Sequence, residues 1–358
     1  MNDNDIIGIF RYGSKFRPVS NFDADEIKMK FKTNVCDYIH KISYKLNIHF
    51  GYFQEWKTLL FSSINTKINN TYNIYPRIIN MNVLSQKIKD IQSKYVITPI
   101  DKASNNFGFI CKKFYAEILN AEIINSNTFA LSNIGYDDIR DSHCHALKEY
   151  EITPSRYNIP FMYSVPKFHK NPTKFRFITS SVNCITKDVS IILNLLLDKL
   201  SNEVETKADT CWIVKNNGKV LQSLTQCNDN PGLPGNHMIT TFDFSTLYTT
   251  LPHDDLIRCL VALYNKYIQQ DVIIHYQNKK LKVSKIEFVN LLKFCIRNSY
   301  ILFDGNIYRQ IIGIPMGANY SPNAANLYLH FYEAKFLNLN PLAGRIRYKH
   351  SHRYIDDL

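Results

Sequence analysis

The sequence predicts an α+β fold in which helices lie on one face of an antiparallel sheet. Patterns typical of strands and of helices alternate along the chain. No glycine-rich turn joins a strand to a helix, as it would in a nucleotide-binding doubly wound sheet. The segment Tyr300–Arg309 has Asp304-Gly305 between apolar flanks, which is the pattern of a tight antiparallel hairpin. These observations favour an α+β fold over a parallel α/β fold.

Few helices and strands can be predicted from the first part of the sequence. Residues 1–90 carry mixed helical patterns with basic and aromatic side chains. The apolar runs Tyr95–Ile100 and Phe107–Cys111 flank a polar loop and predict two strands. A strand at Phe175–Ile178 and a core helix at Ile185–Leu200 follow. We expect three regions: a mostly helical extension over 1–90, a second region over 91–237 and a third over 238–358.

The third region carries the sharpest local signals. Ile239–Phe244 has the pattern of a buried strand, and Ser284 with Glu287 forms a capping-box pattern ahead of a helix. Helices are also predicted to start near Pro252 and at Ser321-Pro322, since proline suits the first turn. Their expected apolar stripes are Leu256, Leu260, Leu263 and Tyr267, and Ala325, Leu329, Tyr332 and Phe336. Segments Arg345–Tyr348 and Arg353–Leu358 close the chain.

The composition narrows the class of protein. The chain has 358 residues, 45% of them hydrophobic, which indicates globular structure with a sizeable core. No segment approaches the roughly 20 apolar residues of a membrane span, and the N-terminus has no secretory pattern. The eight cysteines are scattered without a CxxC pair, which fits free thiols in a reducing compartment. We therefore expect an intracellular, nuclear protein without a membrane partner.

The charge has two interpretations. With 43 basic and 31 acidic residues the net charge is +12, which either serves solubility or indicates a polyanionic partner, nucleic acid first.

Three aspartates carry the candidate chemistry. Asp243 lies near the end of an apolar run. Asp356 and Asp357 are neighbours in the sequence and follow the apolar pair Tyr354-Ile355. A single such Asp is usually explained by a salt bridge or a helix cap. Two adjacent carboxylates repel each other unless a cation relieves the repulsion. Magnesium prefers hard oxygen ligands, and two such ions can activate a 3′-hydroxyl and stabilise leaving pyrophosphate.

The strings around these aspartates resemble three motifs of reverse transcriptases. Thr241–Tyr248 (TFDFSTLY) resembles motif A, Gly313–Pro322 (GIPMGANYSP) motif B, and Tyr354–Asp357 (YIDD) motif C. Upstream, Val165–Lys170 (VPKFHK) and Lys174–Ile178 (KFRFI) resemble the finger motifs of Penelope-like retroelements. The resemblance implies a right-hand polymerase, with fingers-like residues 91–237, palm residues 238–358 and an antiparallel palm sheet. Its implied partners are an RNA template, a DNA primer and deoxynucleoside triphosphates, and no protein partner is expected.

The resemblance also implies roles for individual residues. Asp243, Asp356 and the carbonyl of Phe244 would hold two magnesium ions, which manganese could replace, and Asp357 would support the catalytic site. Tyr248 occupies the position of a steric gate, where a bulky ring excludes a ribose 2′-hydroxyl.

Three further residues would bind the nucleotide. Lys167 and Arg176 would grip the triphosphate, Arg176 through its planar fork. Gly317 would let the backbone approach the nucleotide and template closely. Phe177 replaces the family's usual proline after the fingers arginine, and we expect it to reshape the triphosphate pocket.

The chain departs from the family most at its end, where motifs D and E, the thumb and any endonuclease are missing. We therefore expect a fragment that is inactive as the 358-residue chain. Two alternatives remain: a non-catalytic nucleic-acid-binding remnant and an RNA-directed RNA polymerase. A telomerase shares the palm motifs, but nothing in residues 1–90 matches its separate RNA-binding domain.

Overall fold

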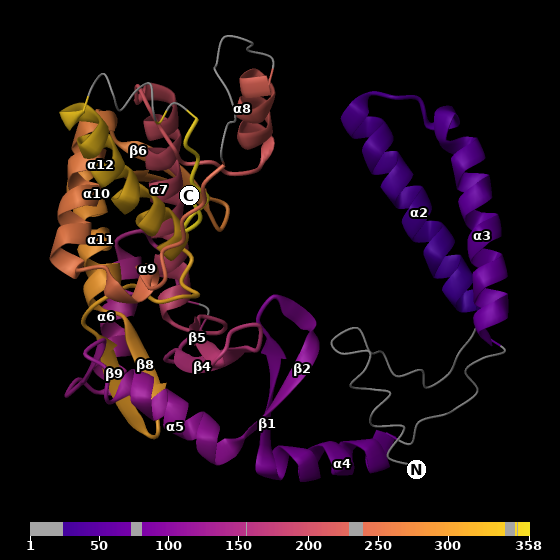
Figure 1. Ribbon diagram of the computed structural model, residues 1–358, viewed down its shortest axis with the longest axis horizontal. Coiled ribbons are helices and arrows are strands. Elements are labelled where there is room, and N and C mark those ends of the chain that lie inside the picture. Colours follow the sequence, from indigo (N-terminus) through magenta and orange to yellow (C-terminus); the bar gives the residue numbers. More distant parts are fainter. Residues whose placement is uncertain (1–23, 73–80, 155, 229–238, 341–347, 349) are drawn as a thin grey trace. The chain divides into compact units, whose positions relative to one another are not determined.

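The computed structural model describes residues 24–72, 81–154, 156–228, 239–340, 348 and 350–358 (Figure 1). The chain divides into two compact units, Met1–Cys111 and Lys112–Leu358, and each is described by itself. The regions expected to be fingers-like and palm thus fall mostly within the second unit. Most of the segment Arg345–Tyr348 lies outside the described residues. No helix in the described ranges is long and apolar enough to cross a membrane.

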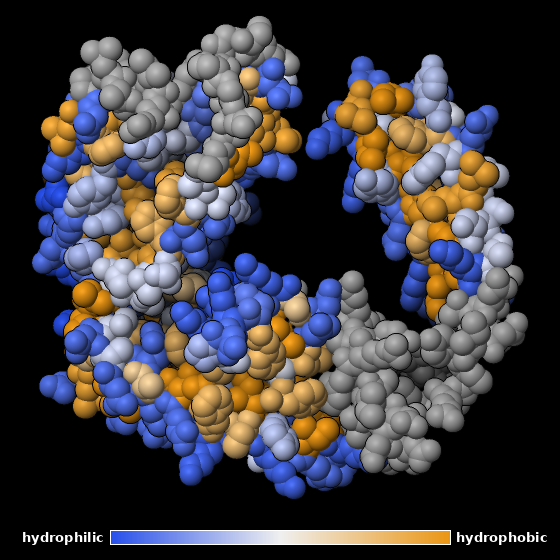
Figure 2. Space-filling view, viewed as in Figure 1, coloured by the Kyte–Doolittle hydropathy of each residue, from blue (hydrophilic) through white to orange (hydrophobic). Residues whose placement is uncertain are grey.

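The first unit combines helices with one hairpin. Its elements are α2 (Ala24–Leu46), η2 (Phe50–Phe53), α3 (Gln54–Tyr72), α4 (Met81–Lys94), β1 (Tyr95–Ile100) and β2 (Ala103–Cys111). The pairing of β1 with β2 is antiparallel, which confirms the two strands predicted around a polar loop. Figure 2 shows apolar surface along α2 and α3, where Met29 and Leu59 are each 71% exposed.

The second unit contains most of the helices and strands. Its helices are α5 (Lys112–Ile123), α6 (Tyr136–Lys148), α7 (Thr186–Lys207), α8 (Gly218–Asn228), α9 (Leu247–Thr250), α10 (His253–Tyr267), α11 (Lys285–Arg297) and α12 (Ser321–Leu339). Its strands are β3 (Phe129–Leu131), β4 (Phe161–Lys167), β5 (Lys174–Ser180), β6 (Val272–Tyr276), β7 (Lys279–Val283), β8 (Tyr300–Phe303) and β9 (Asn306–Gln310).

The larger sheet has the strand order β3-β9-β8-β4-β5 and is antiparallel except between β4 and β8. The expected antiparallel sheet is therefore confirmed, apart from one parallel residue pair, Phe161 with Leu302, between β4 and β8. Parallel neighbours need a long crossover, and here the chain between β4 and β8 passes through α7 and α10. The α+β class itself is confirmed.

Local sequence signals explain several element ends. The Ser284 side chain accepts from the Glu287 N–H (3.3 Å), and the Glu287 carboxylate accepts from the Ser284 N–H (2.6 Å). This confirms the predicted capping box at the start of α11. The hairpin of β8 and β9 turns at Asp304 and Gly305, which both have positive φ, as its tight turn requires.

The core of the second unit forms around α7. Its residues Ile192, Leu193 and Leu196 are fully buried and belong to one cluster with side chains from α10, α11 and α12. The predicted stripe of α10 is buried throughout. The stripe of α12 is only half right, because Tyr332 and Phe336 are exposed at 38% and 43%.

The predicted buried strand at Ile239–Phe244 is wrong. Ile239 is 74% exposed and Phe242 is 62% exposed, and the segment forms only an isolated bridge. A strand becomes buried when neighbours cover its faces. Within the described residues this segment pairs only with the chain end, where Phe242 and Leu358 exchange two backbone hydrogen bonds of 2.8 and 2.9 Å.

Candidate functional site

The structure brings the three aspartates onto adjoining stretches of backbone. Asp243 and Asp357 form an antiparallel bridge, although they lie far apart in the sequence. Beside them, the Phe244 N–H donates to the Asp356 carbonyl at 3.2 Å. These contacts place the segment that resembles motif A against the segment that resembles motif C.

A tight turn carries the paired aspartates. Tyr354 and Asp357 exchange two backbone hydrogen bonds of 2.8 and 3.0 Å, which leaves Ile355 and Asp356 as the two residues of the loop. Ile355 has φ +55°, a left-handed conformation that a β-branched residue rarely adopts. Asp243 and Asp357 are exposed, and Asp356 is half-buried. The turn therefore leaves these carboxylates accessible from solvent.

An open cleft of about 380 Å³ adjoins Asp243. Residues after Asp243, including Phe244 and Thr250, form part of its wall, and Tyr328 and Leu329 of α12 form another part.

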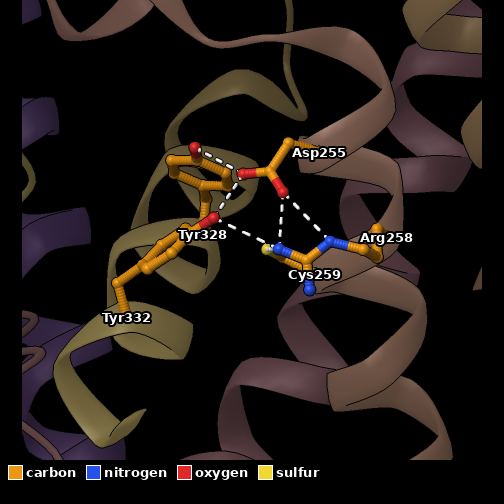
Figure 3. A network of polar contacts seen from close by, with 5 residues as sticks. All are labelled: Asp255, Arg258, Cys259, Tyr328 and Tyr332. Carbon is orange, nitrogen blue, oxygen red and sulfur yellow. Dashed lines mark hydrogen bonds and ion pairs between the residues drawn. The ribbon is translucent and has the colours of Figure 1, made fainter. Parts of the chain in front are cut away.

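A polar network holds one wall of the cleft (Figure 3). The Asp255 carboxylate of α10 accepts hydrogen bonds from the hydroxyls of Tyr328 (2.8 Å) and Tyr332 and pairs with the Arg258 guanidinium. The Tyr332 hydroxyl, followed by Arg258 and Tyr328, holds the pKa of Asp255 below its ordinary value. The network ties α10 to α12 and fixes the ring of Tyr328.

The charges of two candidate site residues, Asp356 and Arg176, act on Tyr248. It belongs to the short helix α9 and is half-buried. Burial, and secondly the negative charge of Asp356, raises the pKa of Tyr248 to about 12, while the positive charge of Arg176 opposes this. The phenol is therefore neutral at physiological pH, and Tyr248, Arg176 and Asp356 share one electrostatic environment.

The loop that resembles motif B packs tightly against α9. The Gly313 N–H donates to the Leu251 carbonyl (2.8 Å), and the Ile314 N–H donates to the Tyr248 carbonyl (2.7 Å). Gly313 has φ +77°, and a Cβ there would lie 2.5 Å from the Tyr248 carbonyl oxygen. Real Cβ atoms do not come this close, so this position requires glycine.

Gly317 is confined in a similar way by β5. A Cβ at Gly317 would lie 2.3 Å from the Thr179 carbonyl oxygen, and its φ is +122°. The Thr179 N–H donates to the Met316 carbonyl at 2.7 Å, and the Ser181 hydroxyl donates to the Gly317 carbonyl at 2.9 Å. The structure therefore gives Gly317 a packing role against the chain's own strand. Its predicted approach to a nucleotide remains a prediction.

Lys167 and Arg176 lie on the hairpin of β4 and β5. The register pairs Arg176 with Val165 and Lys167 with Lys174, towards the end of the hairpin. Both side chains are half-buried. Of these two cations, Arg176 is the one whose charge acts on Tyr248.

The donor set fits magnesium in its chemistry. Asp243 and Asp356 offer hard carboxylate oxygens from two adjoining segments, and magnesium is commonly held by one or two carboxylates plus substrate phosphates. No group of three or more His, Cys, Asp or Glu side chains in the described residues is arranged to hold a metal ion.

Sequence reasoning gave no role to three residues that anchor the turn. Arg353 is fully buried, and its guanidinium bonds to Glu333 and Asn326 of α12. An arginine directly before an apolar pair and two aspartates was the available signal, because a buried guanidinium needs a carboxylate partner.

Comparison with known proteins supports the fold. No family model matches the chain, and neither does any curated protein sequence. A telomerase from Candida albicans, in complex with a TWJ fragment of telomeric RNA, aligns with a TM-score of 0.54 and 13% identity. This match covers 83% of the present chain and 49% of the telomerase chain. An apo telomerase from Candida tropicalis aligns with a TM-score of 0.52 and 14% identity, covering 87% and 50%. The chain thus spans about half the length of these telomerase chains and shares their fold.

Proposed function

We propose that this chain is the fingers and palm of a reverse transcriptase, an RNA-directed DNA polymerase, from a Penelope-like retroelement. One observation carries the proposal: backbone hydrogen bonds join the Asp243 segment to the turn with Asp356 and Asp357. Two-metal nucleotidyl transfer needs carboxylates from separate segments within a few ångströms of each other. The fold shared with telomerases supports the same class of activity.

Each residue has a role in this proposal. Asp243, Asp356 and the Phe244 carbonyl would hold the metal ions, and Asp357 would support them. When bound, the ions would lower the barrier to attack by a primer 3′-hydroxyl and neutralise charge on the leaving pyrophosphate. The neutral ring of Tyr248, beside Asp356, would exclude the 2′-hydroxyl of a ribonucleotide.

The fingers hairpin would supply the cations. Arg176 and Lys167 would bind the triphosphate, with the Arg176 fork matching two phosphate oxygens. Gly317 would keep the motif B loop close to β5. We propose that the loop approaches the nucleotide from this position.

Primer extension tests the proposal. The assay would use an RNA template, a DNA primer, deoxynucleotides and magnesium. It would compare a version of the chain completed beyond Leu358 with the same version carrying Asp356→Asn. The variant should fall to background because it loses a metal ligand and its charge. Asp304→Asn is the matched control, since Asp304 is exposed in a hairpin turn where asparagine fits equally well.

The alternatives predict other results. A non-catalytic remnant would bind the hybrid and give no product, and an RNA-directed RNA polymerase would prefer ribonucleotides. Equal synthesis by wild type and Asp356→Asn would refute the assigned metal site.

A telomerase is the second candidate, because the solved structures described above are telomerases. It would add a repeated sequence copied from an RNA that it carries, whereas the retroelement enzyme would copy any annealed template. Sequencing the products separates the two.

A further inference from the structure

Arg353 is a fully buried charge that directly precedes the turn. Its side chain is 0% exposed, and Glu333, its ion-pair partner on α12, is 14% exposed. Nε and Nη2 donate to the Glu333 carboxylate, and Nη2 also donates to the Asn326 carbonyl at 3.0 Å. Nη1 donates to the Asn326 Oδ1 and to the Ile355 carbonyl, both at 2.8 Å. Every N–H donor of the guanidinium thus has an acceptor.

One of these bonds reaches the strained residue of the turn. Ile355 has φ +55°, and a β-branched residue keeps such a conformation only when its surroundings impose it. The two backbone bonds between Tyr354 and Asp357 close the loop but do not hold the Ile355 carbonyl. Arg353 holds that carbonyl from the interior of the protein.

The backbone of Arg353 is fixed as well. Its N–H donates to the Trp212 carbonyl at 2.7 Å, and its carbonyl accepts from the Val214 N–H at 2.9 Å. A continuous set of contacts therefore runs from α12 through Arg353 to the turn, and on to the Asp243 segment.

We propose that Arg353 is a positioning residue whose guanidinium, held by Glu333 and Asn326, fixes the conformation of the turn that presents Asp356 and Asp357. The inference rests on the proposed function only in assigning the turn to a catalytic site. The competing explanation is that the Arg353–Glu333 pair simply stabilises the fold.

Two variants separate these explanations. Arg353→Met leaves the Glu333 carboxylate buried without its partner, so it should lower both the melting temperature and the order of the turn. The double variant Arg353→Met/Glu333→Leu removes both charges, and replacing a buried ion pair as a unit is often neutral for stability. Its melting temperature should return to near the wild-type value, while the Ile355 carbonyl remains unheld.

Amide hydrogen exchange measures the local stability of the turn directly, whether or not the protein is catalytically active. In the double variant, peptides covering residues 353–358 should exchange at least about tenfold faster than in the wild type, because local opening sets exchange rates. Peptides from α10 should exchange as in the wild type, and they serve as the internal reference. A double variant that regains both stability and slow exchange in the turn would overturn the positioning role.

Steady-state kinetics gives the second readout. A displaced turn should lower kcat for primer extension at least about tenfold while the KM for deoxynucleotides changes little, since an interaction of the transition state is lost. A kcat equal to that of the wild type would overturn the inference. If the version completed beyond Leu358 extends no primer, the proposed function fails, and the exchange measurement still decides whether Arg353 positions the turn.

Discussion

Replacing Gly313 by alanine should destabilise the protein through a steric clash. The same replacement at Gly305 should cause no clash, and it serves as the comparison. Gly313 and Gly305 have nearly equal φ values, +77° and +74°. A Cβ at Gly313 would lie 2.5 Å from the Tyr248 carbonyl oxygen and 2.8 Å from two backbone atoms of Thr249. A Cβ at Gly305 would meet nothing within 4 Å. Comparing the two variants cancels the cost of the left-handed backbone and leaves the cost of the clash.

The expected loss in the free energy of unfolding follows from the hydrogen bonds that the substitution weakens. A left-handed conformation costs an L-residue about 1–2 kcal/mol, and the gain from restricting the unfolded chain offsets part of it. Gly305→Ala should therefore cost about 1 kcal/mol. Gly313→Ala must also displace α9, which weakens the bonds from Gly313 to Leu251 and from Ile314 to Tyr248. At about 0.5–1.5 kcal/mol each, these bring the total to about 2–4 kcal/mol.

Equilibrium unfolding in urea measures both free energies. The midpoint should fall in each variant with an unchanged slope, since neither substitution alters the surface exposed on unfolding. Equal losses in Gly305→Ala and Gly313→Ala would refute the reasoning, because they would show that the loop can move away from α9 at no cost.

Three other outcomes are expected. Tyr248→Ala should admit ribonucleotides into the product of primer extension while deoxynucleotide incorporation continues, and Tyr248→Phe should keep the wild-type selectivity, because only the ring is needed. Asp255→Asn should be less stable than the wild type at neutral pH. The pKa of the Asp255 carboxylate is lowered in the folded protein, so its charge stabilises the fold at every pH above the ordinary pKa of an aspartate. The difference in stability between the wild type and Asp255→Asn should shrink as the pH falls below about 4, the ordinary pKa of an aspartate, and should vanish below the lowered pKa of folded Asp255. A difference that persists in acid would exclude the carboxylate charge as its cause. Binding to an RNA–DNA hybrid should weaken with salt, because the net charge is +12 and each neutralised phosphate adds about 0.9 to the log–log slope on a B-form duplex; a flat salt series would mean that the charge only confers solubility.

The sequence by itself determined the elements whose signals are local. The capping box of Ser284 and Glu287, the turn at Asp304-Gly305 and the apolar stripe of α10 all behaved as predicted. The capping box and the turn depend on atoms within a few residues of one another, so the local pattern determines them. The stripe of α10 specifies which face is apolar, and its burial comes from packing against α7, α11 and α12. The motif strings singled out three aspartates, and their role as a catalytic site stays a prediction.

Only the tertiary structure decided what surrounds these elements. The pattern at Ile239–Phe244 predicts burial, yet its side chains are exposed, because burial depends on which distant segment covers each face. Tyr332 fits an apolar stripe, but its hydroxyl bonds to Asp255 at the surface. The placement of Arg353 against Glu333 joins a helix to a turn, and such a pairing leaves no periodic trace in the sequence. Long-range contacts become possible only when the chain has brought both partners together, and this is why the fold alone fixes the geometry around the aspartates.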